Sequence, residues 1–575
     1  MDKLTKTTDP LLNETQYTYD GNYNKITMTD AKGKTTNYSY DAVNRLTTTT
    51  YPGNSTVNYA YDSNGNRTSM TDSAGTTTYT YDPRNLQTQV GYPDGKTLSY
   101  SYDASTRKTA MTLGGTGTTN YGYDAVNRMT SLTDPAGAPT SYQYDNVGNK
   151  TRMTYPNGSV ANYAYDGANR LTLLENLTST SSVISRYAYE IDSDGNKTRV
   201  TEEDGSTITY AYDELHRLTS EVKKDSAGAT TYSFTYTYDP AGNRLSKTDK
   251  DGNVKSYTYD AANRIQTAGA TNYSFDANGN VVGKTTATGT TSYAYDYEDR
   301  LTTITHPDNK TTTMAYDGDD RRISSTNTSG STTKYVFDGG NVVQENDGTG
   351  ALVANYVVEP QGLMGNIISQ KDSGGSSSFY QYSALSNDAG NVTSLTDTSQ
   401  TAVTTYEYEA FGNTVSQSGT TTNAYKFSTK NLDDESGLYY FGARYYDPET
   451  GRFITKDPDG GDVTDPQSLN PYVYVRNNPL NLIDPDGQQV AEAAVLVGTP
   501  YGWVAVAAVA APANLYGQWY VSTKIGTWAG SKIKNWYFAK RTSKEKKKEK
   551  KIRRKRKRMT KREHDTRKKD HRRRF

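Results

Sequence analysis

The residues with the clearest potential for chemistry are aspartates in the last third of the chain. Asp457 lies in a Lys-Asp-Pro sequence, and Asp484 begins an Asp-Pro-Asp-Gly sequence 27 residues further on. Two carboxylates that share one proton can hydrolyse a peptide bond, because one takes a proton from water while the other donates one. Arg452 precedes both and could keep a carboxylate ionised or orient its strand. Four further aspartates compete for the same role: Asp459, Asp462, Asp465 and Asp486.

The same sequences have a simpler interpretation. Asp-Pro and Asp-Pro-Asp-Gly are ordinary turn sequences, since Pro fixes φ at one corner and Gly relieves the next. Taken alone, residue types and spacing therefore favour turns over an aspartyl protease.

Most other catalytic chemistries find little support in the sequence. The chain has no Cys, which excludes disulfides, a cysteine nucleophile and thiolate metal ligands. Its four His are scattered, and no Gly-rich phosphate loop or Ser-His-Asp arrangement is recognisable. We therefore expect no cofactor and no metal ion. A nuclease in the C-terminal tail would have to use Glu563, His564, Asp565 and His571, around which no nuclease motif is recognisable.

A sequence repeat predicts the elements that would position these aspartates. Tyr-Asp pairs recur through the first part of the chain at steps of 20 or 21 residues, a regularity that marks a repeat architecture. The first eight pairs contain Asp20, Asp41, Asp62, Asp82, Asp103, Asp124, Asp145 and Asp166.

Each repeat predicts a β-hairpin. Before its turn, the segment Asn58–Arg67 alternates Tyr with Ala. In that turn Asp62 can bond backbone groups two residues on, and Gly65 and Asn66 tolerate positive φ. One hairpin is too small to be stable alone, so we expect successive hairpins to stack into one continuous sheet. Tyr59 and Tyr61 would share one face, where packing explains them better than carbohydrate stacking.

Composition agrees with a thin sheet rather than a thick aliphatic core. Only 33% of the residues are hydrophobic, and these include 51 Tyr but only 10 Phe and 4 Trp. Low apolar content can indicate disorder, but abundant Tyr and Thr favour a half-buried pleated surface. The predicted fold class is all-β.

The repeat, with sequences such as YDSNGNR and YDPAGNR, resembles the YD repeats of bacterial Rhs proteins, of the C components of Tc toxins and of the teneurin shell. Further along, SGLYYFGARYYDPETGRFITKDP and NPYVYVRNNPLNLIDPDG resemble the Rhs repeat-associated core domain. The two resemblances cover about residues 15–487.

This resemblance implies a spiral of stacked β-hairpins that forms a hollow shell around the segment after the core. It also implies a catalytic role for Asp457 and Asp484, with Arg452 in support, in cutting the chain between Gly487 and Gln488. Two features depart from the family. Repeats begin near Gln16, so we expect this chain to lack the N-terminal domains that seal the other end of the shell, and Gln488 stands where some members have Leu.

The chain changes character after Gly487. Residues 493–523 contain no charged side chain, a length sufficient to cross a bilayer, although Gly and Pro interrupt the run. Residues 540–575 carry a net charge of +17, against −17 for the rest of the chain. Such a tail could bind nucleic acid or anionic lipid, or remain a solvated run of like charge. We expect this end to be non-β, either helical or disordered.

These observations predict four segments and a function. The function expected from the resemblance is containment and delivery of a C-terminal effector, in competition between cells or in virulence. Its partners would be its own C-terminal segment as cargo, an immunity protein, a secretion machinery, and a membrane or nucleic acid. One alternative is a carbohydrate-binding adhesion protein of the cell surface or wall, and another is a truncated, inactive Rhs copy. The predicted segments are the repeat shell (1–350), the last repeats and core (351–487), an apolar segment (488–539) and a basic tail (540–575).

The N-terminus predicts the route of export only indirectly. Its first ten residues contain no apolar stretch of the kind found in a secretory signal. We therefore expect a bacterial protein that reaches the cell surface or the medium through a specialised export system, with membrane association through residues 493–523.

Overall fold

The computed structural model describes residues 3–360, 366–384, 390–419, 421–458, 460–461, 465–488, 490–492, 498–499 and 502–503. The chain divides into two compact units, Met1–Pro512 and Ala513–Phe575, and the second lies wholly outside the described residues. The predictions for residues 493–523 and for the basic tail therefore fall almost entirely outside the described residues.

A continuous antiparallel sheet of 39 strands forms most of the first unit, each strand pairing with the next along the chain. Its first part comprises β1 (Lys6–Thr8), β2 (Glu14–Tyr19), β3 (Lys25–Thr29), β4 (Thr35–Tyr40), β5 (Leu46–Thr50), β6 (Thr56–Tyr61), β7 (Arg67–Asp72), β8 (Gly75–Tyr81), β9 (Gln87–Gly91), β10 (Thr97–Tyr102), β11 (Lys108–Leu113), β12 (Gly117–Tyr123), β13 (Met129–Thr133), β14 (Pro139–Tyr144), β15 (Lys150–Thr154), β16 (Val160–Tyr165), β17 (Leu171–Leu177), β18 (Val183–Ile191), β19 (Lys197–Glu202) and β20 (Thr207–Tyr212). It continues with β21 (Leu218–Lys224), β22 (Thr230–Tyr238), β23 (Arg244–Asp249), β24 (Val254–Tyr259), β25 (Ile265–Ala268), β26 (Thr271–Phe275), β27 (Val281–Thr286), β28 (Gly289–Tyr295), β29 (Leu301–Thr305), β30 (Thr311–Tyr316), β31 (Arg322–Thr326), β32 (Thr332–Asp338), β33 (Asn341–Asp347), β34 (Leu352–Val358), β35 (Ile367–Asp372), β36 (Ser377–Ala384), β37 (Gly390–Thr396), β38 (Ala402–Tyr408) and β39 (Thr414–Gly419).

In the turn around Asp41 the aspartate closes the turn, and the arginine four residues on ties it to the next repeat. Asp41 Oδ1 accepts hydrogen bonds from the N–H groups of Val43 and Arg45, at 3.0 and 2.9 Å. The Arg45 side chain contacts Asp41 Oδ2 at 2.6 Å and also donates to the carbonyl of Asp62, one repeat later, at 2.9 Å. The motif therefore fixes both the turn and the spacing between neighbouring hairpins.

The repeat that contains Asp62 follows the same plan with a different fourth residue. Asp62 Oδ1 accepts the N–H of Asn64, two residues on, as predicted. Gly65 has a φ of 88°, whereas Asn66 keeps a negative φ and instead donates its amide to Asp62 Oδ2 at 2.8 Å. The predicted conformational freedom was therefore needed at Gly65 alone.

The tyrosine before the aspartate uses its hydroxyl group to bond the preceding strand. Tyr61 donates to the carbonyl of Leu46 at 2.9 Å, and Tyr123 donates to that of Lys108 at 2.9 Å, in each case 15 residues back along the chain. The strand register shifts by a β-bulge just before the same tyrosine, between Ala60 and Tyr61 for example. A Phe would fill the space but leave the carbonyl without this partner.

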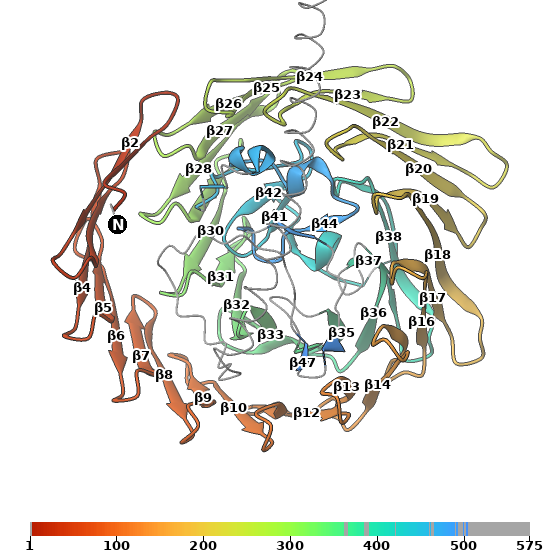
Figure 1. The fold of residues 1–575 in the computed structure, drawn as a ribbon, viewed down its shortest axis with the longest axis horizontal. Coiled ribbons are helices and arrows are strands. Elements are labelled where there is room, and N and C mark those ends of the chain that lie inside the picture. The colour runs from red at the N-terminus through yellow and green to blue at the C-terminus, as the bar shows by residue number, and fades with distance from the viewer. Residues whose placement is uncertain are drawn as a thin grey trace, which may run out of the picture. The chain divides into compact units, whose positions relative to one another are not determined.

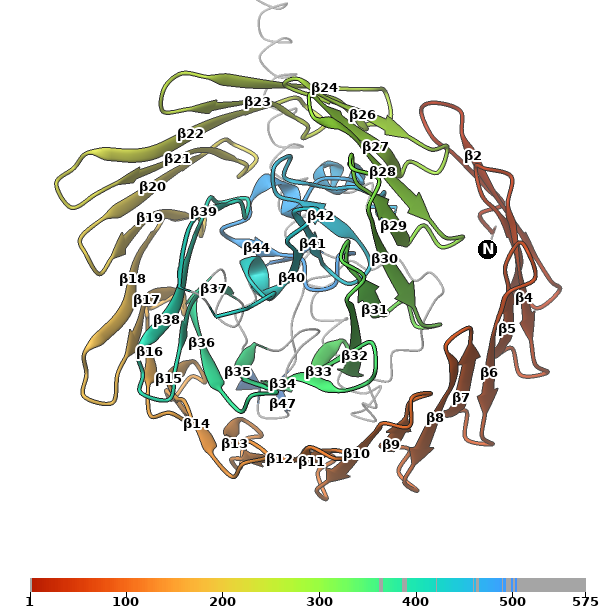
Figure 2. The ribbon, with the colours of Figure 1, turned by 180° about the vertical axis from the view of Figure 1, so that it is seen from behind.

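The sheet curls until distant repeats meet. We call β2–β23 the first arc and β26–β38 the second arc, which lies within the outline of the first (Figures 1 and 2). Lys32 binds Asp276 at 3.1 Å, and Lys108 binds Asp338 at 3.0 Å, so residues more than 200 positions apart form the seam between the arcs. The predicted all-β stack of hairpins is confirmed.

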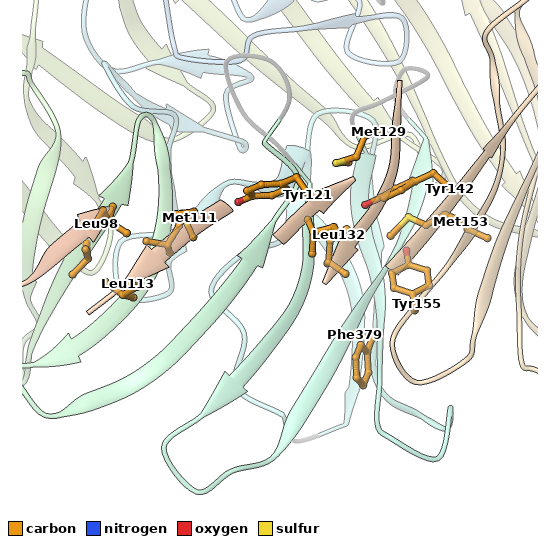
Figure 3. Packing of buried hydrophobic residues seen from close by; sticks show 14 of the residues in the cluster. Leu98, Met111, Leu113, Tyr121, Met129, Leu132, Tyr142, Met153, Tyr155 and Phe379 are labelled. Atoms are coloured by element: carbon orange, nitrogen blue, oxygen red, sulfur yellow. The ribbon is translucent and has the colours of Figure 1, made fainter. Parts of the chain in front are cut away.

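Apolar side chains line one face of the sheet and continue across the seam. On β10, Leu98 and Tyr100 are buried while the intervening Ser99 is not. Figure 3 shows Phe379 of β36 beside the part of the first arc that carries Met153 and Tyr155, and the three side chains belong to one cluster. The hydrophobic interior is thus a thin layer along the long sheet, as the composition predicts.

A small separate subdomain, here called the core, follows the long sheet. It contains a four-stranded sheet and an aromatic cluster whose members include Phe427, Phe441, Tyr446, Phe453 and Tyr474. Its elements are η1 (Phe427–Thr429), β40 (Asn431–Asp433), β41 (Leu438–Tyr440), β42 (Tyr445–Asp447), β43 (Arg452–Phe453), η2 (Pro466–Leu469), η3 (Val475–Asn477) and β44 (Leu482–Ile483). The described residues after it add β45 (Ala491–Glu492), β46 (Gly498–Thr499) and β47 (Gly502–Trp503).

Charged side chains join the core to strands of the long sheet. Glu449 contacts Lys255 at 2.5 Å and Lys284 at 2.8 Å, and burial alone would raise its pKa, but the two lysines lower that pKa to about 2. Arg322 on β31 donates to the hydroxyl of Tyr445 at 3.0 Å and to the side-chain oxygen of Asn431 at 2.7 Å. These contacts hold the core against β24 and the second arc.

Candidate self-cleavage site

The loop between β41 and β42 forms the floor of the candidate site. Gly442 has a φ of 107°, and a Cβ atom there would lie 2.9 Å from the carbonyl oxygen of Asp486. The next residue, Ala443, donates its N–H to that same oxygen at 2.9 Å. The absence of a side chain at Gly442 therefore lets the Asp-Pro-Asp-Gly turn pack directly on the loop.

Arg444, at the end of this loop, contacts both predicted aspartates. Its Nη2 atom lies 2.9 Å from Asp457 Oδ2 and 3.4 Å from Asp484 Oδ2. The guanidinium carbon lies 3.7 Å from the ring centre of Phe453, and Nη1 donates to the carbonyl of Pro471 at 3.0 Å. Stacking, burial and these hydrogen bonds hold the guanidinium in place between the two carboxylates.

The pairing of neighbouring segments brings the two aspartates together. Arg452 forms an isolated β-bridge with Val473, and the N–H of Asp457 donates to the carbonyl of Pro471 at 2.9 Å. The segment that follows β43 thus runs beside the segment that leads to Asp484. The predicted pair is therefore close in space.

The peptide unit of Gly487 is held between the same groups. Its N–H donates to Asp484 Oδ1 at 2.7 Å, and its carbonyl accepts a short hydrogen bond from Arg444 Nε. Gly487 has a φ of 79°, and a Cβ atom would approach the backbone N of Arg444 to 3.1 Å. The next N–H, that of Gln488, donates to Asp486 Oδ1 at 3.0 Å. A cation therefore lies on the carbonyl of the peptide bond that the resemblance identifies as the cleavage point.

Burial gives the two aspartates different environments. Asp484 is 1% exposed and Asp457 18%. Burial raises the pKa of Asp484 to about 6, against the opposing effect of Arg444, and the nearby Asp486 carboxylate adds to the rise. One carboxyl group can thus keep a proton in mildly acidic solution while the other lies closer to water.

The other predicted site residues lie elsewhere. Arg452 points to the wall of the long sheet, where Nη1 donates to Asn243 at 3.1 Å and Nη2 to the carbonyl of Asn263 at 2.6 Å. Asp465 pairs with Arg476, at 2.5 Å. Asp459 and Asp462 lie outside the described residues. The catalytic assignments of Arg452, Asp457, Asp484, Gly487 and Gln488 remain predictions.

Sequence reasoning missed two cations of this site, Arg444 and Lys430. Arg444 and Arg452 lie in one stretch of the core, and nothing in their spacing shows which of them faces the aspartates. Lys430 donates to the carbonyl of Pro485 at 2.5 Å and is 2% exposed. A lysine before a short strand carries no signal in the sequence, because solvated lysines are far more common than buried ones.

Within the described part of the chain, no group of three or more His, Cys, Asp or Glu side chains is arranged to hold a metal ion. Over the same residues, no helix combines the length and apolarity needed to cross a membrane.

Two family models match the chain. The teneurin YD-shell model matches residues 187–480, and the RHS repeat model matches residues 25–56, 61–97 and 123–160. Both agree with the resemblance in the sequence, and the first includes Arg444, Asp457 and most of the core but ends before Asp484.

Curated relatives share shorter stretches. A tRNA3(Ser)-specific nuclease WapA from Bacillus spizizenii is 32% identical over 234 residues, which are 40% of this chain and 10% of that protein. The toxin subunit YenC2 from Yersinia entomophaga is 56% identical over 54 residues, 9% of this chain and 5% of that protein. The chain thus spans a tenth or less of the length of these relatives.

Among solved structures, the complex TcdB2-TccC3-Cdc42 has a TM-score of 0.71 with 18% identity, over 84% of this chain and 28% of that chain. A likeness at that identity shows the fold, a long sheet of stacked hairpins. Because the YD-shell model spans just over half of the sequence, the chain belongs to the teneurin YD-shell family of Rhs-repeat proteins.

Proposed function

We propose that this protein is a shell that encloses its own C-terminal segment as an effector, delivers it in competition between cells, and cuts it free after Gly487. Relatives with toxin names support the proposal: YenC2 is a toxin subunit, and Tse5 from Pseudomonas aeruginosa, 43% identical over 65 residues, is a toxin protein. These residues are 11% of this chain and 4% of Tse5. The family fold supplies the wall that such containment needs.

One observation carries the cleavage step. Arg444 binds the carbonyl of Gly487 and both aspartates at the point where the core ends and the apolar segment begins. A structural turn would need the hydrogen bond from Gly487 N–H to Asp484, but not a guanidinium on the following carbonyl. Donors on a carbonyl oxygen are what a hydrolytic site provides for the developing negative charge.

The groups present balance a hydrolysis. Asp457, ionised and more exposed, takes a proton from a water molecule whose oxygen attacks the carbonyl carbon of Gly487. Arg444 stabilises the oxyanion that forms. Asp484, protonated at its raised pKa, gives its proton to the nitrogen of Gln488 as the carbon–nitrogen bond breaks. Gly487 keeps a new carboxyl group and Gln488 gains a new amino group. The proton on Asp457 then passes to Asp484, which restores the starting state of the pair.

The test is the recombinant full-length chain on a denaturing gel with mass spectrometry. We expect a separate fragment of residues 488–575 that is lost in Asp457→Asn and in Asp484→Asn. The matched control is Asp465→Asn, because Asp465 pairs with Arg476 instead of Arg444. An intact wild-type chain would remove the protease from the proposal.

The effector role needs its own test, because residues 488–575 lie mostly outside the described part. Expression of that segment alone should arrest growth, with membrane depolarisation if the apolar run acts and nucleic-acid damage if the tail does. Harmless expression would favour a surface protein or an inactive Rhs copy instead. Export through a specialised system and protection by an immunity protein are part of the same proposal.

A further inference from the structure

Lys430 contacts the cleavage turn at a different carbonyl from Arg444. Its ammonium group donates to the carbonyl of Pro485 at 2.5 Å and lies 5.1 Å from the ring centre of Phe441. The residue is 2% exposed, so the cost of burying its charge must be offset by the groups around it. The proposed hydrolysis uses Asp457, Asp484 and Arg444, but not this cation.

The two residues just before Lys430 are anchored to the long sheet. The N–H of Ser428 donates to the side chain of Asn391 at 2.9 Å, and the hydroxyl of Thr429 donates to the carbonyl of Gly390 at 3.0 Å. Both partners lie at the start of β37. The lysine therefore connects a strand of the second arc to the turn that precedes the cleavage point.

We propose that Lys430 is a positioning residue for self-cleavage: by holding the Pro485 carbonyl it keeps the Gly487 peptide seated between Arg444 and Asp484. The inference rests on the proposed cleavage function. Only Asp486 separates Pro485 from Gly487, so a shift of the Pro485 carbonyl moves the Gly487 carbonyl away from Arg444. Misplacement by about 1 Å costs on the order of a hundredfold in rate.

The charge of Lys430 also acts on the protonation of Asp484. Burial lowers the pKa of Lys430 to about 8, so the group is still cationic where Asp484 titrates. Its positive charge opposes the rise in the pKa of Asp484. The charged or titratable groups that face Asp484 are Arg444 with its partner Asp457, Lys430, Asp486 and Tyr474.

The experiment follows cleavage of the newly synthesised full-length chain over time, across the pH range around the pKa of Asp484. Lys430→Met should slow cleavage at least roughly tenfold. It should also move the alkaline limb of the pH profile to higher pH, because Asp484 without the cation stays protonated longer. Lys430→Arg should recover part of the rate and the wild-type profile, which a loss of folding would not do.

The matched control is Lys426→Met. Lys426 is also buried, at 6% exposed, and lies at the other end of η1, but it pairs with Asp434 at 3.0 Å rather than with the cleavage turn. Its profile should stay that of the wild type. If wild type cleaves, Asp484→Asn does not, and Lys430→Met keeps the wild-type rate and profile, this inference is wrong while the proposed function stands. If wild type itself stays intact, the proposed function fails first.

Discussion

Arg67 in the first arc and Asp319 in the second form a two-pronged ion pair across 252 residues of sequence. Both bonds, Nη1 to Oδ1 and Nη2 to Oδ2, measure 2.6 Å. The guanidinium also packs on Tyr79, 4.7 Å from its ring centre, and donates to its hydroxyl at 3.0 Å. The seam is therefore a specific junction, in which one arginine pairs with one aspartate of the opposite repeat.

Replacing this carboxylate should loosen the seam in a pH-dependent way. Burial alone would raise the pKa of Asp319, but Arg67 holds it below its ordinary value. Its contribution to stability is therefore present above the pKa of the unfolded chain and lost as the pH falls through the lower pKa of the folded one. At neutral pH, Asp319→Asn should cost about 2 kcal/mol, and in strong acid the difference should vanish.

The measurement is the midpoint of urea unfolding at several pH values. The matched control is Asp308→Asn, because Asp308 pairs with Lys310 at 3.1 Å on a well-exposed turn. It should leave the urea midpoint almost unchanged, because water screens an ion pair whose two partners are both exposed. Equal effects of the two substitutions would show that the ion pair at the seam stabilises the chain no more than an exposed ion pair does.

The same junction predicts a steric effect at Gly318. A Cβ atom there would lie 2.5 Å from Val57 Cγ1 and 3.0 Å from Met70 Sδ. Gly318→Ala should therefore destabilise the chain by about 1–3 kcal/mol through overpacking. Val57→Ala should restore part of the loss, so that the double variant is more stable than the sum of the singles predicts.

Thermal or urea unfolding of the wild type, the two single variants and the double variant gives the coupling energy between positions 318 and 57. Gly21→Ala serves as the control, because a Cβ atom at that turn meets nothing within 4 Å. Strictly additive effects of the pair at positions 318 and 57 would mean that the two arcs do not touch there in solution.

The hairpin repeat could be predicted because its determinants are local. Asp41 caps a turn two and four residues away, and Tyr61 reaches a carbonyl 15 residues back, so one repeat contains the information for its own shape. The pairing of Arg67 with Asp319 could not be predicted. It depends on small twists added over many hairpins, and sequence spacing does not measure the curvature that results.

The candidate site was predictable in part for a similar reason. Asp457 and Asp484 drew attention through the family resemblance, and the structure brings both to one guanidinium. The choice between Arg444 and Arg452 depends on which way each side chain leaves its strand or loop. That direction is set by the packing of Phe453 and by the wall residues Asn243 and Asn263, which lie about 200 positions earlier in the sequence.

The pKa of Asp484 predicts the pH dependence of cleavage. If Asp484 donates a proton to the leaving nitrogen, the rate should fall as the pH rises above about 6, where this carboxyl group loses its proton. Asp486→Asn removes a negative charge that helps to raise this pKa, so the alkaline limb should move to lower pH. The Asn side-chain oxygen can still accept the N–H of Gln488. A limb that stays in place in this variant would exclude Asp484 as the titrating acid.

Arg444 and Arg452 make opposite predictions that can be compared in one experiment. Arg444→Lys loses the planar fork that reaches the Gly487 carbonyl and two carboxylates at once, so cleavage should slow by about a hundredfold or more. Arg452→Lys loses contacts with the wall at Asn243 and Asn263, so the midpoint of urea unfolding should fall more than the rate of cleavage does. Each variant is assayed for both quantities. A folded Arg452→Lys chain that cleaves as slowly as Arg444→Lys would return the catalytic role to Arg452, because the wall contacts alone cannot slow a reaction in which they take no part.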